Sequence, residues 1–281
     1  MTTPPTLDPR NTQFEWAFHQ GALTSVTEDQ MRAFDEDGFF LLEGAFDADE
    51  VAQVVAAIDP IHDKNVEFLR TRENEKLFIA EAGNLVFSTH MVLRSPFLRE
   101  WVAGPVFTDL VRDIIGPDVR LYWDQAVYKE PEKPRAFPWH QDNGYTFIEP
   151  QQYLTLWLPL VDVDEENGCP WIAPGLHRLG TLEHWMTDYG WQCLDDPEGA
   201  VAVPARAGDI VVFSSLTPHL TGPNTSGSVR KAYIVQYAPD GAVVRGSGEA
   251  MEGRQDDPDR QYFVLRDGVR VSPPPLPTRA S

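Results

Sequence analysis

Two short segments, far apart in the chain, carry residues able to hold one metal ion. The first is His140-Gln141-Asp142 and the second is Pro218-His219. Two imidazoles and one carboxylate form a ligand set that leaves one face of an octahedral Fe(II) ion open. Arg230 lies shortly after the second histidine, and its planar guanidinium can hold a carboxylate co-substrate by two parallel hydrogen bonds. The pattern therefore requires a fold that brings distant segments to one ion, and it predicts an oxygenase that consumes 2-oxoglutarate.

The residues around these segments place them at strand ends. Side chains at positions i and i+2 of a strand point the same way, so we expect His140 and Asp142 to face one metal from a single strand end. We expect Gln141 to point elsewhere. His219 follows the strand-like run from Asp209 to Phe213, and we expect it in a polar loop bounded by proline.

From Val119 onward the chain consists of short β-like runs separated by Pro, Gly, Asn and Asp clusters. This pattern predicts a mainly β (α+β) fold, with a double-stranded β-helix (a jelly-roll, cupin-like core) behind flanking N-terminal helices. The expected strands are Val119 to Lys129, Tyr153 to Val161, Gly168 to Ile172, Val201 to Val203, Asp209 to Phe213 and Lys231 to Tyr237.

The N-terminal part reads as the helical layer. Thr27-Glu28-Asp29-Gln30 is a capping box, which predicts a helix to about Asp37. The apolar run 38–42 predicts a buried strand, and a second helix is expected to open at Asp47 to Glu50. We expect segments 64–82 and 95–116 to be helix or loop.

We expect one domain over residues 1–281, because all-β barrels and sandwiches of this size often form a single domain. Residues 1–20 are predicted to be a flexible lead. Residues 240–281 are predicted to be a loop-rich tail with one strand at Gln261 to Leu265.

The net charge of −20 argues against nucleic acid and anionic membranes as partners, since both need a basic surface. No apolar run is long enough to span a bilayer. The chain has two cysteines, Cys169 and Cys193, and its start lacks the features of a signal peptide. A cytoplasmic protein that acts on a small-molecule substrate is expected, and the sequence does not predict an oligomeric state.

Several segments together make the chain resemble the phytanoyl-CoA dioxygenase family of Fe(II)/2-oxoglutarate oxygenases, from about Thr27 to about Tyr237. One residue departs from the family pattern: Leu176 replaces the usual serine of a Pro-Gly-Ser-His stretch, outside the proposed metal ligands. The segments that carry the resemblance are Phe34 to Phe39, Tyr128 to Pro131, His140 to Asp142, Glu166 to Cys169, Pro174 to His177, Gly208-Asp209, His219 to Asn224, and Arg230.

The resemblance implies the cofactors and their contacts. It implies Fe(II) bound by His140, Asp142 and His219, with 2-oxoglutarate and O2 as co-substrates and no catalytic side chain beyond the metal centre. It implies that Arg230 holds the distal carboxylate of 2-oxoglutarate. Three further groups are candidate co-substrate contacts: Thr221, Gln125, and the pair Thr155 and Trp157, which share a strand face and are otherwise ordinary core residues.

Residues flanking the proposed site are candidates for binding the primary substrate: Trp139, Asn143, Tyr145 and Trp171. They would provide an apolar pocket with polar tips, or they belong to the core of the jelly roll. The implied reaction is hydroxylation of an unactivated carbon with release of succinate and CO2. Two alternatives are a cupin-type metalloenzyme that does not use 2-oxoglutarate and a non-catalytic jelly-roll binding module.

Overall fold

The computed structural model describes residues 5–246 and 253–277. Its helices are α1 (Glu28–Asp37), α2 (Ala48–Arg70), α3 (Pro96–Trp101), α4 (Pro105–Ile114) and α5 (Asp142–Tyr145), with 3-10 turns η1 (Glu73–Glu75), η2 (Met91–Leu93) and η3 (Leu176–Leu179). Its strands are β1 (Phe39–Leu42), β2 (Lys76–Leu77), β3 (Ala80–Glu81), β4 (Leu85–Thr89), β5 (Val119–Lys129), β6 (Phe137–His140), β7 (Ile148–Glu149), β8 (Leu154–Pro159), β9 (Pro170–Ile172), β10 (Trp185–Thr187), β11 (Gly190–Gln192), β12 (Val201–Ala202), β13 (Ile210–Ser214), β14 (His219–Thr221), β15 (Arg230–Pro239), β16 (Val243–Val244), β17 (Gly253–Arg254), β18 (Phe263–Arg266) and β19 (Val269–Arg270).

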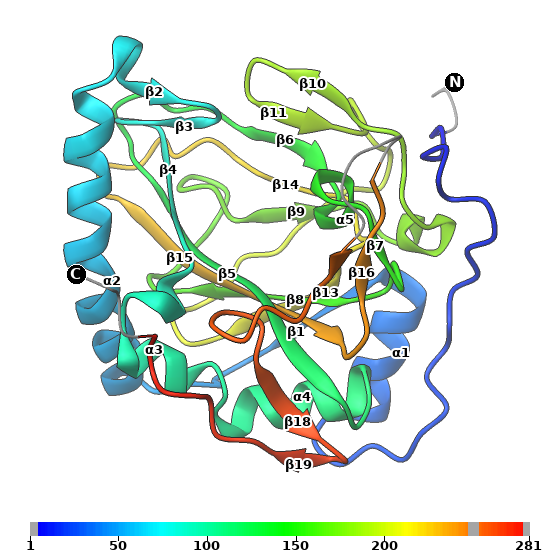
Figure 1. Cartoon of the computed structure of the whole chain (residues 1–281). Helices are drawn as coiled ribbons and strands as arrows, with labels where there is room; N and C mark the ends of the chain where they lie inside the picture. The colour runs from blue at the N-terminus through cyan, green and yellow to red at the C-terminus, as the bar shows by residue number, and fades with distance from the viewer. Residues whose placement is uncertain (1–4, 247–252, 278–281) are drawn as a thin grey trace.

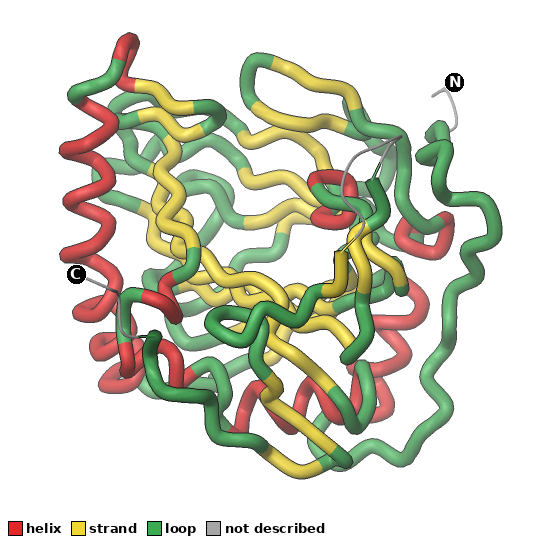
Figure 2. Tube along the Cα trace, in the orientation of Figure 1, coloured by secondary structure: helices red, strands yellow, loops and turns green. Residues whose placement is uncertain are grey.

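Two β-sheets form the centre of the molecule (Figure 1). The larger sheet has the strand order β1-β13-β8-β15-β5-β4-β3-β2, and β18 extends it by pairing with β5. The smaller sheet has the order β12-β9-β14-β6. Figure 2 shows the strands in the middle of the molecule and most of the helices at its periphery. This arrangement confirms the predicted mainly β jelly-roll class with helices ahead of the core.

The larger sheet has two faces with different roles, because neighbouring side chains of a strand point to opposite sides. In β15, Tyr233, Val235 and Tyr237 belong to the main apolar core, together with residues of α1, α2, α3 and α4. Ala232 and Ile234 belong instead to a second cluster shared with β9 and β12 of the smaller sheet. The helices therefore cover one face, and the space between the sheets is left for a pocket.

The predicted N-terminal elements are confirmed. Thr27 caps α1, its side chain accepts from the Gln30 backbone N–H, and the Gln30 side chain completes the capping box. The helix ends at Gly38, whose φ of 90° is left-handed and suits a residue without a Cβ. Asp47 caps α2 in the same way, and α2 then packs beside β4 at one edge of the larger sheet (Figure 1).

The predicted strands are also present, with ends that differ by at most two residues. Most of the segment 64–82 is helix or turn, as expected, but it also contains a hairpin of two-residue strands, β2 and β3. Seven further strands were not predicted: β4, β7, β10, β11, β16, β17 and β19. All of them except β4 have only two or three residues, too few to show strand periodicity in the sequence.

Both terminal segments contact the rest of the described structure. Within 5–20, Leu7 bridges Leu182, and the Trp16 ring lies 4.4 Å from the His177 ring. In the tail, β16 pairs with β7, and β18 provides the strand expected near Gln261 to Leu265. Residues 1–4, 247–252 and 278–281 of these two segments lie outside the described residues. None of the described helices is both long and apolar enough to cross a membrane.

We predict that Gly38→Ala destabilises the protein by about 2–5 kcal/mol, the sum of a left-handed backbone cost and overpacking. A Cβ at Gly38 would lie 2.6 Å from both His177 Nδ1 and Thr217 Oγ1. The matched control is Gly44→Ala, which has φ of 62° and no atom within 4 Å, so it should cost only about 1–2 kcal/mol. Urea unfolding measures both; equal losses would contradict the packing argument.

Candidate metal centre and co-substrate pocket

The smaller sheet brings the two histidines of the sequence pattern together. His140 is the last residue of β6, and His219 is the first residue of β14. The two strands are antiparallel neighbours in which His219 lies directly opposite His140, and the imidazole centroids are 4.1 Å apart. Cross-strand pairing therefore determines the distance between two side chains that are far apart in sequence.

Asp142 approaches the histidines from a different kind of element than the one predicted. We expected His140 and Asp142 on one strand face, but β6 ends at His140, and Asp142 is the first residue of the one-turn helix α5. The turn, closed by a hydrogen bond from Gly144 N to Gln141 O, aims the carboxylate back at the imidazoles. The expected loop position of His219 was also wrong, since β14 starts at this residue.

The three side chains present their ligand atoms to a common point. Asp142 Oδ1 is 3.9 Å from Nε2 of His140 and 3.9 Å from Nε2 of His219. One ligand atom from each residue lies within 4.8 Å of the others. These distances are too long for hydrogen bonds and suit three ligands around one ion, so the donor set fits a ferrous ion.

Backbone carbonyls fix both imidazole rings. His140 Nδ1 lies 2.8 Å from Pro138 O, and His219 Nδ1 lies 3.0 Å from Thr217 O. Because a carbonyl only accepts, each Nδ1 carries the proton and each Nε2 keeps a free lone pair. Burial, followed by the charge of the neighbouring His219 ring, lowers the pKa of His140 well below its ordinary value, which favours the neutral form that binds metals.

The carboxylate of Asp142 is held by a side chain of the larger sheet. Thr155 Oγ1 on β8 donates to Asp142 Oδ2 over 2.5 Å. Gln236, opposite Thr155 on β15, donates from Nε2 to Thr155 Oγ1 over 3.2 Å. The sequence predicts Thr155 as a co-substrate contact, whereas its hydroxyl is committed to Asp142 here. Gln236 was not predicted, because its contact depends on which strand pairs with β8.

Arg230, the first residue of β15, is 1% exposed and has no carboxylate partner among the described residues. Its Nη1 donates to Val127 O over 3.1 Å, whereas Nε and Nη2 have no hydrogen-bond partner. Burial lowers the pKa of the guanidinium to about 10. A buried cation with two unused donors is costly unless an anion binds beside it.

One pocket contains the three ligand candidates and Arg230. Its cavity volume is about 60 Å³. Four predicted co-substrate contacts line it: Gln125, Thr155, Trp157 and Thr221. The rest of its wall is apolar and includes residues that had no prediction, namely Leu85, Phe87, Val127, Phe137, Pro170, Phe213 and Ile234. A short apolar run at 85–87 was present in the sequence and contains part of this wall.

The structure places the four candidate substrate contacts outside the lining of this pocket. Trp139 precedes His140 in β6 and therefore faces the other way. Trp171 lies between Pro170 and Ile172, which are buried while it is partly exposed. Asn143 donates to Thr181 Oγ1 and accepts from Ile148 N, so both ends of its amide are used structurally.

Tyr145, the fourth candidate, packs behind the site rather than in it. Its ring lies parallel to that of Phe137 with centroids 6.4 Å apart, and at right angles to the His140 ring at 5.4 Å. Desolvation raises the pKa of Tyr145, and a Cβ at Gly190 would lie 2.7 Å from its hydroxyl oxygen. Tyr145 thus supports two residues of the pocket wall from outside.

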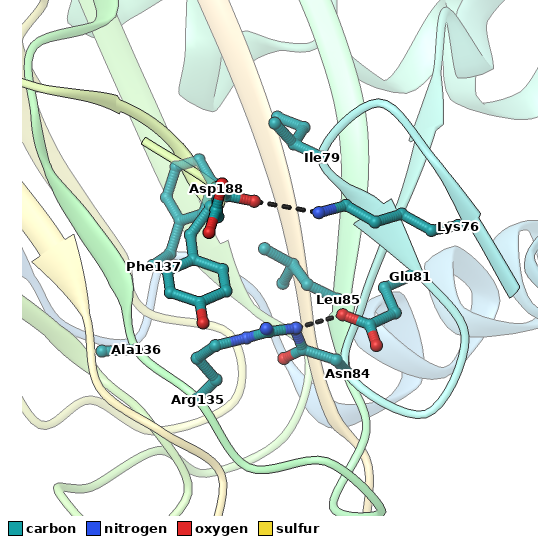
Figure 3. A pocket seen from close by; sticks show the side chains of 10 residues that line it. Lys76, Ile79, Glu81, Asn84, Leu85, Arg135, Ala136, Phe137 and Asp188 are labelled. Carbon is teal, nitrogen blue, oxygen red and sulfur yellow. Dashed lines mark hydrogen bonds and ion pairs between the residues drawn. The ribbon is translucent and has the colours of Figure 1, made fainter. Parts of the chain in front are cut away.

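A small second pocket beside the site shares Leu85 and Phe137 with it (Figure 3). Here the β2–β3 hairpin meets the β10–β11 hairpin. Lys76 Nζ donates to Asp188 O over 2.9 Å, and Arg135 forms an ion pair with Glu81. Lys133 pairs with the carboxylates of Glu75 and Glu81, so Lys133 and Arg135 are both neutralised by carboxylates beside the site.

Comparison with known proteins decides the family. A family model described as phytanoyl-CoA dioxygenase (PhyH) matches residues 34–232, which is most of the chain and close to the predicted range. The chain belongs to the phytanoyl-CoA dioxygenase family.

Individual relatives and solved structures match the chain over most of its length. Phytanoyl-CoA dioxygenase domain-containing protein 1 of Mus musculus is 26% identical, with 82% of this chain and 96% of the relative covered. Ectoine dioxygenase of Bordetella parapertussis is 28% identical, with 76% of this chain and 75% of the relative covered. The crystal structure of SnoK, a non-heme alpha ketoglutarate dependent carbocyclase from nogalamycin biosynthesis, has a TM-score of 0.66 at 25% identity over 84% of this chain and 98% of SnoK.

The phytanoyl-CoA dioxygenase family member described here is an oxidoreductase, a dioxygenase dependent on Fe(II), 2-oxoglutarate and O2. This confirms the activity class and the cofactors predicted from the sequence. It disfavours the two alternatives, a cupin-type enzyme without 2-oxoglutarate and a binding module.

We predict that Thr155→Val lowers the affinity for Fe(II) about 10- to 100-fold, because Asp142 loses the hydrogen bond that orients its carboxylate. Thr155→Ser keeps the hydroxyl and should bind Fe(II) like the unmodified protein. Anaerobic titration with Fe(II) measures both variants. A Thr155→Val affinity equal to that of Thr155→Ser would contradict this role.

Proposed function

We propose that this dioxygenase holds Fe(II) with His140, Asp142 and His219 and hydroxylates an unactivated carbon of a small organic substrate, releasing succinate and CO2. The observation that carries the assignment is the buried, unpaired guanidinium of Arg230 in the same pocket as three converging ligand atoms. Ferrous iron bound there would supply the redox chemistry that activates dioxygen for attack on a carbon–hydrogen bond. The protein contributes position, charge and exclusion of water.

Arg230 is the proposed partner of the distal carboxylate of 2-oxoglutarate. Its Nε and Nη2 are the unused donors, and a carboxylate can accept from both in a bidentate pair. The Trp157 ring lies 5.4 Å from the guanidinium carbon, which limits the orientations open to it. We also assign Gln125, Trp157 and Thr221 to this part of the pocket, because they line it together with Arg230.

The apolar wall has a proposed role in the reaction. Leu85, Phe137 and Pro170 line the pocket and leave few polar groups near the three ligand candidates. An apolar wall excludes water from the reacting groups and favours a substrate that presents a hydrocarbon segment to them. The support for hydroxylation of such a segment is this composition and the dioxygenase class.

We further propose that residues 1–281 form one domain. The N-terminal segment contacts the loop before β10 through the bridge between Leu7 and Leu182, and the C-terminal segment joins the larger sheet through the pairing of β18 with β5, which supports a single unit. The two cysteines, Cys169 and Cys193, are buried free thiols, which is consistent with a reducing, cytoplasmic location.

We predict that His140→Ala and Asp142→Ala each lower turnover more than about 100-fold, because each removes one of three ligands. Succinate release with Fe(II), 2-oxoglutarate and a panel of small organic substrates is the measurement. His19→Ala, in the N-terminal segment, is the control and should retain activity. Near-normal succinate production by either ligand variant would refute the assignment of the metal site.

We predict that Arg230→Met raises the half-saturating concentration of 2-oxoglutarate about 10- to 100-fold, since a hydrogen-bonded ion pair with one carboxylate is worth roughly 1.5–3 kcal/mol. Arg206→Met, at an exposed position, is the control for removal of one positive charge. Kinetics as a function of 2-oxoglutarate concentration measure the effect. An unchanged dependence would assign the co-substrate carboxylate to another group.

A further inference from the structure

Lys129 is a second buried cation, next to Arg230 but outside the pocket lining. It is the last residue of β5, and the side chain is 0% exposed. Its Nζ lies 3.2 Å from Arg135 O, 3.0 Å from Thr221 O and 2.6 Å from Gly222 O. It also lies 3.0 Å from Thr221 Oγ1. Like Arg230, it has no carboxylate partner among the described residues.

Strand pairing makes Lys129 and Arg230 neighbours. They lie directly opposite one another in the antiparallel pair of β5 and β15. Burial, with the positive charges of Arg230 and Arg135, lowers the pKa of Lys129 well below its ordinary value. Three backbone carbonyls around Nζ act in the opposite direction, because they accept hydrogen bonds and favour an ammonium group. A bound dicarboxylate would add negative charge beside both cations.

The hydrogen bond to Thr221 has a fixed direction. An ammonium group only donates, so Thr221 Oγ1 accepts from Lys129 and keeps its own proton available. No acceptor for this hydroxyl proton occurs among the described residues. Thr221 lines the same pocket as Arg230. Lys129 therefore leaves the Thr221 hydroxyl as a donor in the same pocket in which Arg230 has two unused donors.

We propose that Lys129 is a positioning residue for the co-substrate: it orients the Thr221 hydroxyl so that this group and Arg230 together bind the distal carboxylate of 2-oxoglutarate. The inference rests on the proposed function of Arg230 and adds a residue that does not line the pocket. The proposal also gives a reason for burying a lysine. If Lys129 only held β5 against residues 221–222, its hydrogen bonds to the backbone carbonyls would be enough and the contact with the Thr221 hydroxyl would have no role.

The test compares two co-substrates in a set of variants. 2-Oxopentanoate has the carbon chain and keto-acid end of 2-oxoglutarate but lacks the distal carboxylate. Calorimetric titration of the Fe(II)-loaded protein without oxygen gives a Kd for each compound. Lys129→Met, Thr221→Val and the double variant are compared with Lys231→Met, a matched control on β15 whose lysine pairs with Asp59 instead.

We predict that Lys129→Met and Thr221→Val each weaken 2-oxoglutarate binding about tenfold and change the Kd of 2-oxopentanoate less than about twofold, because only the former has a distal carboxylate. In the Thr221→Val background, Lys129→Met should weaken 2-oxoglutarate less than about threefold, since residues that act through one another are not additive. The variants should keep the Fe(II) affinity of the unmodified protein, and Lys231→Met should leave the Kd values of both compounds unchanged.

Several results would overturn the proposal. An equal factor for Lys129→Met in both backgrounds means that Lys129 does not act through Thr221, and an equal loss for both compounds means general damage to the pocket. If Lys129→Met does not fold, Lys129→Gln replaces it. Thr221→Val alone also tests the proposal, because an unchanged Kd for 2-oxoglutarate in this variant refutes the role of the hydroxyl. Failure of the unmodified protein to bind 2-oxoglutarate would instead refute the proposed function.

Discussion

The antiparallel pairing of β6 with β14 is the interaction on which the site depends. It places His140 opposite His219, while backbone carbonyls two residues before each histidine hold the rings. A shift in register between His219 and Thr221 then pairs Thr221 with Phe137, so that both line the same pocket. One pair of short strands thus positions two metal-ligand candidates, part of the apolar wall and the hydroxyl near Arg230.

The buried cations near the pocket favour binding of an anion and lower the stability of the protein without one. Removing an unpaired cation from water costs on the order of several kcal/mol, and both Arg230 and Lys129 are buried without a carboxylate partner among the described residues. Backbone carbonyls offset part of this cost for Lys129, whereas Arg230 keeps two donors without partners. Because folding has already removed these cations from water, an anion that binds here gains attraction and hydrogen bonds without that further cost. A ligand that binds only the folded state should also stabilise the protein against unfolding.

The two faces of the larger sheet have different roles, since one packs in the core and the other lines the pocket. In β8, Leu154, Leu156 and Leu158 belong to the core shared with the helices, whereas Thr155 and Trp157 line the pocket. A strand can serve both because neighbouring side chains point in opposite directions. The helices α1 to α4 stabilise the sheet from one side, and polar groups can therefore be tolerated on the other.

The sequence by itself determined the elements that depend on near neighbours along the chain. A capping box at Thr27 and an opening at Asp47 to Glu50 predicted two helices, and strand periodicity predicted most of the larger sheet with Thr155 and Trp157 on one face. The spacing of polar residues indicated an iron and 2-oxoglutarate enzyme. Local periodicity carries no information about cross-strand partners, so the contacts that complete the site could not be predicted in this way.

Only the tertiary structure decided which groups meet. Helix α5 turns Asp142 back toward the histidines, and Thr155 donates a hydrogen bond to its carboxylate. Four predicted substrate contacts lie outside the pocket lining: Trp139, Asn143, Tyr145 and Trp171. The tertiary structure also buried Lys129 beside Arg230, although a lysine at the end of a strand is ordinarily solvated. The physical reason is that burial and hydrogen-bond partners arise from strand pairing and sheet packing, which join residues far apart in the chain.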